Sequence, residues 1–445
     1  MVFNGEIYNH KDLRLELESI SNRNWLGHSD TETLLAAIEE WGLEETLNRA
    51  KGMFALALWD KNSKRLSLAR DRIGEKPLYY GWQGENANKT FLFGSELKSL
   101  KQHPSFEGEV NRNAIALQLR HNCIPDPYSI YKNIYKLLPG HYLELKENDL
   151  KKNLSPKESV YWSLKKCVLD GEESQIDQSD IEIQKNLEKH IKLSVKQQMI
   201  SDVPLGAFLS GGIDSSTVVS LMQEQSIKPI KTFAIGFTED QFNEAHHAKK
   251  IAKHLNTDHT ELYFSPKMAM NEIPNLPNIY DEPFSDNSQI PSILLSRLAK
   301  KQIKVALSGD GADELFFGYN RYNSINNSFK KLNLLPNLLK KFLVKRIKSM
   351  TDENWNKLFN SLPYFKKYKN HGYKVKAMNI LQNKSFSELY FILCSHWQNP
   401  SKVVINSEEP DTFHNEFNSD ISNLSNFHKM MYIDQLTYMP NDILV

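Results

Sequence analysis

The string Ser210-Gly211-Gly212-Ile213-Asp214-Ser215-Ser216 restricts the fold of this chain more than any other feature. It follows the apolar run 205–209, which has the composition of a buried strand, and it leads into a helix expected from about Ser215. Two glycines let the backbone pass close to an oxyanion, and a helix N-terminus with two hydroxyl donors adds to such a site. Asp214 can lie beside a bound polyphosphate only if the two share a cation. The alternative interpretation is a glycine turn that caps an ordinary helix.

A parallel α/β sheet is predicted around this loop. Further apolar runs at 232–236 and 304–307 are separated by helical segments, and continuous apolar strands that alternate with helices are typical of such sheets. Ligands of parallel sheets bind at the carboxyl ends of the strands, where this loop falls. From about residue 322 to residue 440 the chain is predicted to be mainly helical, and it carries no recognisable motif there.

The run 304–307 leads into a second acidic loop, Ser308-Gly309-Asp310-Gly311-Ala312-Asp313-Glu314-Leu315-Phe316. Three carboxylates within five residues repel one another unless a cation or a proton lies between them. This loop also falls at the carboxyl end of a predicted strand, so both loops are expected at one edge of the sheet. The alternative for Asp310 and Glu314 is a turn with a charge at the start of a helix.

The first part of the chain is predicted to be rich in antiparallel β-structure. An apolar run at 53–60, a run of period two at 65–70 and short apolar strands at 77–81 and 91–94 follow one another, with one helix near 31–41. Strands that pair in sequence order indicate antiparallel sheets with flanking helices.

Length and composition together indicate two domains. A chain of 445 residues exceeds what one hydrophobic core normally organises. The segment 146–180 is rich in Lys, Glu, Asp, Asn and Ser and shows little periodicity. We therefore predict a first domain at 1–150, a linker at 151–180 and a second domain at 181–445.

Bulk composition argues against several classes of protein. With 55 basic and 54 acidic residues, the overall charge suggests neither a nucleic-acid nor a membrane partner. The cysteines, Cys123, Cys167 and Cys394, form no CxxC pair, which disfavours a disulfide framework or a zinc site and fits a reducing cytosol. The longest compact apolar stretch, 53–59, is too short to span a bilayer, and no signal peptide is recognisable. We expect a soluble cytoplasmic protein whose partners are small molecules.

The two acidic loops resemble those of the asparagine synthetases, whose second domain is an N-type ATP pyrophosphatase. The first loop matches the family's Ser-Gly-Gly-x-Asp-Ser-Ser string and the second its Ser-Gly-(Glu/Asp)-Gly-(Ala/Ser)-Asp-Glu-(Leu/Val) string. The chain contains no Gly-Lys pair and therefore no GxxxxGK(S/T) phosphate loop. The resemblance implies an α/β parallel-sheet domain with a helical C-terminal part, and ATP and Mg²⁺ as cofactors. It also implies that an acceptor carboxylate attacks the α phosphorus of ATP and that pyrophosphate leaves from the first loop.

Site residues of the second domain follow from this resemblance position by position. It implies Asp214 and Asp313 as magnesium ligands, and Asp310 as the catalytic acidic residue that assists formation of the adenylate and attack by ammonia. Contacts with ATP or pyrophosphate are implied for Phe208, Leu209, Ser210, Gly211, Gly212, Asp214, Ser215, Ser216, Ile235, Ser308 and Gly309. The string 281–286 resembles one near the family's acceptor pocket, although an acidic turn after a helix would look the same.

The N-terminal motifs resemble the class-II glutaminase domain of the same family, an α+β N-terminal-nucleophile-hydrolase fold of stacked sheets. Asn4-Gly5-Glu6 and Asp30 stand in the order and spacing of that domain. The resemblance implies that Asn4 and the Gly5 N–H form the oxyanion hole for the glutamine carboxamide. It implies further that Glu6 helps to hold glutamine and that Asp30 binds its α-amino group. A structural ion-pair network is expected for Arg70, Asp71, Arg72 and Glu96.

Two departures from the family pattern concern the ends of the chain. The family's glutaminase nucleophile is a cysteine at the mature N-terminus, whereas this chain begins at Met1 and no other cysteine can take that place. The chain stops at Val445, where the family places a lysine that contacts the phosphates and the adenylate. The expectation is a chain truncated at both ends, with impaired glutaminase and synthetase activity.

Three hypotheses of function remain. The first is glutamine-dependent synthesis of asparagine from aspartate, in which ATP yields AMP and pyrophosphate through a β-aspartyl adenylate. The second keeps this chemistry but changes the acceptor, because relatives amidate sugar acids or close β-lactam rings with a disabled first domain. The intact Asn4-Gly5-Glu6 and Asp30 disfavour the β-lactam version, and a sugar acid stays open. The third is a non-catalytic remnant that only binds nucleotide or a partner subunit. The acceptor, the regulation and the oligomeric state, with a homodimer among the options, are left open.

Overall fold

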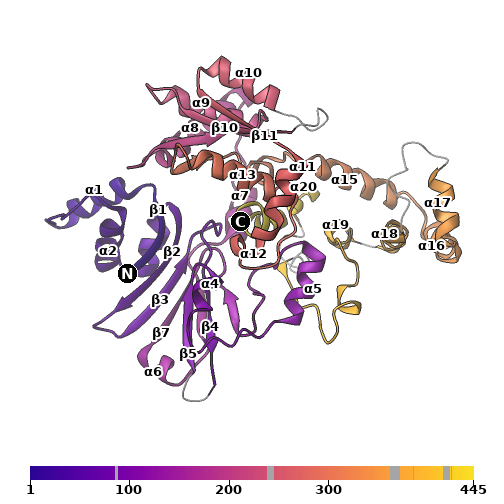
Figure 1. Cartoon of the computed structure of the whole chain (residues 1–445), viewed down its shortest axis with the longest axis horizontal. Helices are drawn as coiled ribbons and strands as arrows, with labels where there is room; N and C mark the ends of the chain where they lie inside the picture. The colour runs from indigo at the N-terminus through magenta and orange to yellow at the C-terminus, as the bar shows by residue number, and fades with distance from the viewer. Residues whose placement is uncertain (86–88, 238–244, 361–370, 384, 414–420, 422) are drawn as a thin grey trace.

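The computed structural model describes residues 1–85, 89–237, 245–360, 371–383, 385–413, 421 and 423–445. Figure 1 shows two antiparallel sheets in the N-terminal part, a parallel sheet with its helices at a distance from them, and a helical C-terminal part. This mixed arrangement confirms the predicted order of sheet types along the chain.

Five antiparallel strands form the first sheet, in the spatial order β1-β2-β3-β7-β8. Their bounds are β1 Val2–Ile7, β2 Gly52–Asp60, β3 Arg65–Arg70, β7 His141–Lys146 and β8 Lys157–Val160. Successive side chains of a strand point to opposite faces. In β2, Phe54 and Leu56 pack into the core under the helices, while Ala55 and Ala57 pack into the core between the sheets. Because both faces are buried, β2 is apolar at every position of its centre.

The second sheet and the helices complete a layered N-terminal part. Its antiparallel strands are β5 Thr90–Gly94, β4 Tyr79–Gln83 and β6 Ile134–Lys136, in that spatial order. The core on the outer face of the first sheet includes side chains from α1 His10–Ile20, α2 Asp30–Trp41 and α3 Leu43–Arg49. The core on the outer face of the second sheet includes side chains from α4 Leu97–Leu100 and α5 Arg112–His121. The predicted antiparallel sheets with flanking helices are therefore confirmed.

The parallel sheet has the spatial order β11-β10-β9-β12. Its strands are β9 Leu205–Phe208, β10 Lys231–Phe237, β11 Asp258–Phe264 and β12 Val305–Leu307. One face packs on α8 Asp180–Gln198, α9 Ile213–Glu224 and α10 Ala245–Leu255, and the other packs on α13 Gln289–Ala299. The predicted parallel α/β sheet is confirmed. The helix expected from about Ser215 begins two residues earlier, because Gly212 already serves as its N-cap.

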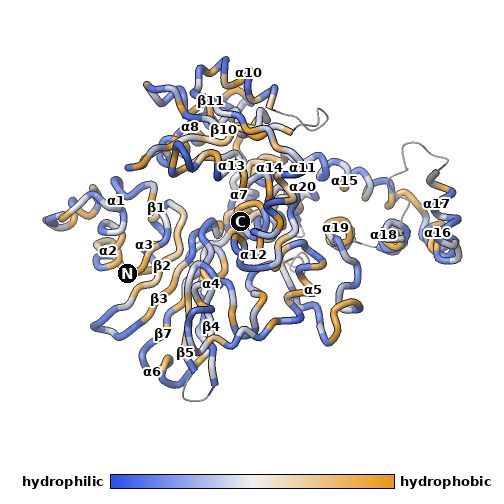
Figure 2. The backbone as a smooth tube through the Cα atoms, in the orientation of Figure 1, coloured by the Kyte–Doolittle hydropathy of each residue, from blue (hydrophilic) through white to orange (hydrophobic). Residues whose placement is uncertain are grey.

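The C-terminal part is mainly helical, as predicted. Its elements are α14 Ala312–Phe316, α15 Asn320–Asn333, α16 Asn337–Ser349, α17 Asp352–Asn360, α18 His371–Gln382, α19 Phe386–Cys394, η5 Pro400–Lys402, α20 Asn426–Leu436 and the π-helical turn η7 Met439–Ile443. Tyr322, Tyr390 and Ile433 are fully buried and join α15, α19 and α20 in one core. The helix α19 is the strongly hydrophobic segment of this part (Figure 2).

The segment predicted as a linker, 151–180, holds regular structure. The strand β8 adds to the edge of the first sheet, and α7 Leu164–Glu173 packs on the C-terminal helical core through Leu164 and Val168. Short elements complete the chain, namely α6 Glu147–Lys151, α11 Pro266–Glu272, η3 Ile273–Asn275 and α12 Leu276–Ile279. The division into two domains at these bounds stays a prediction. Within the described ranges, no helix has the length and apolar character that crossing a membrane requires.

Candidate functional site

The loop that follows β9 adopts a backbone conformation that requires glycine, and it leads into α9. Gly211 has a φ of +89°, and a Cβ there would lie 2.7 Å from the backbone nitrogen of Ala248 and 2.8 Å from Cβ of His247. Only glycine fits this combination of positive φ and close backbone approach. Gly212 is the N-cap of α9, so the N-terminus of that helix faces the loop.

Serine hydroxyl groups hold the loop in this shape. The Oγ atoms of Ser210 and Ser215 lie 2.9 Å apart, and the Gly212 N–H donates to Ser210 Oγ at 3.2 Å. Ser216 Oγ donates to the carbonyl oxygen of Gly212 at 2.6 Å. The predicted pyrophosphate residues thus form one compact turn, and their contact with pyrophosphate stays a prediction.

Replacing Gly211 with alanine should weaken the binding of Mg·ATP about tenfold or more. The added Cβ meets the backbone of α10, and a left-handed residue other than glycine costs about 1–2 kcal/mol, which corresponds to roughly tenfold in affinity. Gly171→Ala in α7 is the matched control, because its Cβ would enter open space. Titration of both variants with Mg·ATP tests the prediction, and equal affinities would contradict it.

The two acidic loops meet at the carboxyl end of the sheet. β9 and β12 are parallel neighbours, with Leu307 opposite Ala207, so the loops that follow them emerge side by side. A Cβ at Gly309 would lie 2.8 Å from the Ser215 nitrogen and 3.0 Å from Asp214 Cβ. The second loop therefore rests directly on the N-terminus of α9, as expected from the position of both loops at strand ends.

The charges of Asp214 and Asp313 act on one another across this contact. Burial raises the pKa of Asp313, the charge of Asp214 raises it further, and Arg321 opposes the shift. In the described part of the chain, no three His, Cys, Asp or Glu side chains are grouped as a metal site. Two carboxylates beside an anion-binding loop fit Mg²⁺, which protein sites bind with one or two carboxylates and substrate phosphates. As metal ligands, both residues remain predicted.

The other residues predicted to contact ATP or react lie around the same edge. Asp310 is exposed in the second loop, and its N–H donates to Ser308 Oγ at 3.4 Å. Leu209 is buried in the core, and its N–H donates to the Phe233 carbonyl oxygen at 2.9 Å, so neither group is free for adenine. Phe208 and Ile235 are half-buried on β9 and β10.

A second group of predicted residues comes together on β1. Asp30 Oδ2 accepts the N–H of Ile7 at 2.9 Å, which fixes the start of α2 against the strand. Burial raises the pKa of Glu6, and Asp30 raises it further, so the two carboxylates predicted to hold glutamine are neighbours. Asn4 Nδ2 donates to Ser95 Oγ at 3.0 Å. Gly5 is required by the close pairing of β1 with β2, since a Cβ would lie 2.1 Å from the carbonyl oxygen of Met53.

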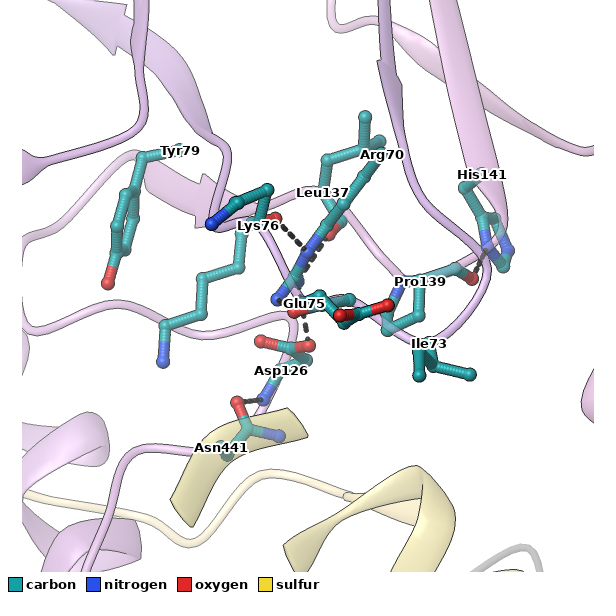
Figure 3. A network of polar contacts seen from close by, with 12 residues as sticks. Arg70, Ile73, Glu75, Lys76, Tyr79, Asp126, Leu137, Pro139, His141 and Asn441 are labelled. Carbon is teal, nitrogen blue, oxygen red and sulfur yellow. Dashed lines mark hydrogen bonds and ion pairs between the residues drawn. The ribbon is translucent and has the colours of Figure 1, made fainter. Parts of the chain in front are cut away.

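The residues expected to form one ion-pair network have separate partners. Arg70 forms a buried ion pair with Asp126 at 3.0 Å, and it donates to the carbonyl oxygens of Gly74 and Leu137 at 2.9 and 2.8 Å (Figure 3). Asp71 accepts backbone N–H groups instead, including that of Phe54 at 3.1 Å. Arg72 donates to the carbonyl oxygens of Asn48 and Ala50, and Glu96 pairs with Lys98. These roles are structural, as expected, but they do not join the four residues into one network.

The two acidic residues that begin the string 281–286 form contacts with the N-terminal part of the chain. Asp281 accepts the N–H of Leu97 at 2.5 Å, and Glu282 forms an ion pair with Lys136 at 2.8 Å and accepts the N–H of Ile130 at 2.7 Å. Both carboxylates therefore bind the N-terminal part of the chain. The sequence alone did not predict these contacts of Asp281 and Glu282, because partners about 150 to 180 residues away leave no local pattern.

Comparison with known proteins matches both parts of the chain. The family model described as asparagine synthase matches residues 186–445, and the one described as glutamine amidotransferase domain matches residues 1–162. An asparagine synthetase [glutamine-hydrolyzing] of Bacillus subtilis is 32% identical over the whole chain, which spans 65% of that protein. A putative asparagine synthetase [glutamine-hydrolyzing] of Methanocaldococcus jannaschii is 38% identical over 72% of the chain, aligned with 58% of its own length.

The chain thus spans about two thirds or less of the length of these relatives. The most extensive family match covers more than half of the chain and contains both acidic loops. Together with the adjacency of these loops at the carboxyl end of the parallel sheet, it establishes that the chain belongs to the asparagine synthase family.

Proposed function

We propose that the chain carries the synthetase site and the glutamine-binding part of an enzyme that makes asparagine with glutamine as the source of nitrogen, in which ATP is converted to AMP and pyrophosphate. The observation that carries this proposal is the juxtaposition of Asp214 and Asp313 between the loops after β9 and β12. An ATP pyrophosphatase needs a place where the negative charge of departing pyrophosphate is balanced, and this edge of the sheet provides one. The names of the relatives support the same reaction.

In the proposed first step, an oxygen of the aspartate side-chain carboxylate attacks the α phosphorus of ATP. The bond between the α phosphorus and its bridging oxygen breaks, and pyrophosphate leaves with the electron pair toward Ser210, Gly211, Gly212, Ser215 and Ser216. Asp214 and Asp313 would hold Mg²⁺, which neutralises charge on the phosphates when it is bound. The backbone of Phe208, Ile235, Ser308 and Gly309, with the carbonyl group of Leu209, would position the nucleotide.

In the second step, ammonia attacks the acyl carbon of the β-aspartyl adenylate. AMP leaves with its oxygen, and the extra proton of the added nitrogen is lost. Asp310 is exposed in the loop that carries Asp313, which suits a group that exchanges protons with a bound intermediate. It is the residue assigned to assist both steps.

Ammonia would come from glutamine bound in the N-terminal part. The layers of helix, sheet, sheet and helix support an N-terminal-nucleophile-hydrolase fold for this part. Asn4 and the N–H of Gly5 would form the oxyanion hole, with Glu6 and Asp30 as ligands of the glutamine amino acid group. The substrates would be glutamine, aspartate and ATP, and the cytoplasm would be the site of action.

A cavity between the two parts supports transfer of ammonia. It has a volume of about 210 Å³, and its lining includes Ile73 and Pro139 of the N-terminal part and Tyr432 and Met439 of the C-terminal part. Met439 also borders the second acidic loop, because its Sδ would lie 3.4 Å from a Cβ at Gly311. The cavity thus adjoins the place proposed for the adenylate.

An assay of ATP products tests the proposed function. With Mg²⁺, aspartate and ammonium chloride, the protein should form AMP and pyrophosphate in equal amounts, and a uronic acid in place of aspartate should give at most about one tenth of that rate. Formation of ADP, or of AMP without an acceptor, would contradict the proposal. A higher rate with a uronic acid would show that the acceptor is a sugar acid.

A further inference from the structure

The C-terminal helices contain a segment whose charges have one sign only. No acidic residue lies between Glu314 and Asp352, whereas the same stretch holds eight lysine and arginine residues. Five of them belong to α16, namely Lys340, Lys341, Lys345, Arg346 and Lys348. The chain as a whole is nearly neutral, which is why no membrane partner was expected from its overall charge. The overall charge therefore hides a local excess of positive charge.

One side of α16 is used for packing, and the other side is exposed. The helix packs on α18, and its partly buried apolar residues are Leu343, Val344 and Ile347. Leu338 is 82% exposed and Phe342 is 63% exposed, and because they are four positions apart they share a face of the helix. Exposed basic residues surround them. We call this surface the α16 face, and it includes Leu338, Lys341, Phe342, Lys345, Arg346 and Lys348.

The stability of the helix does not explain the charges of the α16 face. Lys341 and Lys345 are four positions apart, and like charges at this spacing destabilise a helix. Basic residues in the last turn, here Arg346 and Lys348, interact favourably with the helix dipole, but that effect does not reach Lys341 in the first half of the helix. The charges are thus retained against a local cost.

The described part of the chain supplies no counter-charge to the α16 face. The first acidic residues after it are engaged elsewhere, since Asp352 pairs with Lys374 at 3.0 Å and Glu353 pairs with Lys357 at 2.8 Å. None of the four basic side chains of the α16 face forms an ion pair with a described residue. An anionic partner would provide the missing counter-charge.

A helix with a solvated surface elsewhere in the chain has a different composition. The first half of α8 is exposed, and it combines Glu182 and Glu188 with Lys185 and Lys189. Charges of both signs on one helix are typical of a surface that faces only water. The α16 face has no acidic member, so it does not follow this pattern.

The position of α16 suits contact with an extended surface. Figure 1 shows α16, α17 and α18 at one end of the molecule, beyond α15 and away from the parallel sheet. The end of α15 adds the exposed residues Lys330, Lys331 and Leu334 to the same segment. A surface that docks on this end leaves the loops after β9 and β12 at a distance.

We propose that the α16 face docks on an anionic lipid surface. Its lysine and arginine side chains bind the charged headgroups, and Leu338 and Phe342 enter the boundary between headgroups and acyl chains. A nucleic acid would match the charges but not these two side chains, because its phosphate backbone attracts cations and offers nothing to an exposed leucine. The proposal is independent of the reaction, and it adds a peripheral membrane contact to a chain whose nucleotide loops stay accessible.

Sedimentation of the full chain with lipid vesicles tests the proposal. The chain should bind vesicles of phosphatidylcholine and phosphatidylserine, bind vesicles of phosphatidylcholine alone at least about tenfold more weakly, and dissociate as the salt concentration rises. Lys341→Glu combined with Lys345→Glu should weaken binding to the anionic vesicles at least about tenfold. Phe342→Ser should weaken it at least about fivefold, because an apolar side chain no longer enters the boundary.

The first half of α8 offers matched controls. Lys185→Glu combined with Lys189→Glu reverses two exposed lysines at the same spacing, and Leu187→Ser removes an exposed apolar side chain. Neither control should change vesicle binding more than about twofold. Equal melting temperatures by circular dichroism show that each variant is folded. Should the doubly reversed α16 variant fail to fold, Phe342→Ser and the salt dependence of the unmodified chain still decide the outcome.

Three results would overturn the proposal. The first is an unmodified chain that binds neither kind of vesicle or binds both equally. The second is undiminished binding of anionic vesicles by folded variants of the α16 face. The third is binding of duplex DNA, but of no vesicle, that is lost in the variant with Lys341→Glu and Lys345→Glu; this result would assign the face to a nucleic acid.

Discussion

The Asp214→Asn variant should release pyrophosphate from ATP at least about a hundred times more slowly than the unmodified chain. Asparagine keeps the size of the side chain but removes the charge that a shared magnesium ion requires between the two loops. Asp313→Asn should have a similar effect, since the charges of the two carboxylates act on one another. Pyrophosphate release with aspartate and ammonium chloride, measured over a range of magnesium concentrations, checks both variants. Part of the lost rate should return at high magnesium.

The stability of the Asp214→Asn variant separates a lost ligand from a damaged loop. Asp214 raises the pKa of Asp313, so the two charges repel one another when no cation lies between them. Without magnesium, the variant should therefore melt at the same temperature as the unmodified chain or at a higher one. Asp258→Asn is the control for both measurements, because Asp258 is exposed at the amino end of β11, at the opposite edge of the sheet. Undiminished pyrophosphate release by Asp214→Asn would show that this carboxylate holds no essential metal.

The Arg70→Met variant should lose about 3–5 kcal/mol of unfolding free energy in the N-terminal part. Arg70 and Asp126 are 3% and 1% exposed, so the substitution leaves a buried carboxylate without its counter-charge. The carbonyl oxygens of Gly74 and Leu137 lose a donor at the same time. Denaturation by urea, followed by circular dichroism, should show an earlier transition for this part of the chain.

Two further variants make the Arg70 prediction specific. Arg65→Met removes a half-exposed ion pair between Arg65, which lies on the same strand as Arg70, and Glu144, and its effect should stay within about 1 kcal/mol. Adding Asp126→Asn to Arg70→Met should recover part of the loss, because an uncharged amide is less costly to bury than an unpaired carboxylate. If Arg70→Met and Arg65→Met shift the transition equally, the buried pair has no special role in stability.

The loop proposed to bind the nucleotide could be predicted because the residues that define it are neighbours in the sequence. Gly211 and Gly212 follow a strand and precede a helix, and this order alone places backbone N–H groups at a helix N-terminus. Asp313 lies in the loop region that follows the neighbouring strand β12, and parallel strands bring their carboxyl ends to one edge. Periodicity predicted the strands well where side chains alternate, as in β3, and missed β8 because its polar composition resembles a loop.

The polar contacts between the N-terminal and C-terminal parts of the chain could not be predicted, because the residues that form them are far apart in sequence. Nothing beside Glu282 distinguishes a carboxylate that pairs with Lys136 from one in a solvated turn. The ion pair between Arg321 and Asp434 is a further example, since the two residues are 113 positions apart and meet only when α15 packs against α20. Long-range charge pairing leaves no periodic signal.

The sequence by itself determined the family, the order of the sheets and the two acidic loops, because backbone requirements such as the positive φ of Gly211 are written at single positions. The tertiary structure decided which charges meet. It paired Arg70 with Asp126, turned Asp281 and Glu282 toward the N-terminal part, and paired Arg321 with Asp434. The physical reason is that the energy of a charge depends on burial and on neighbours that the chain brings together only on folding.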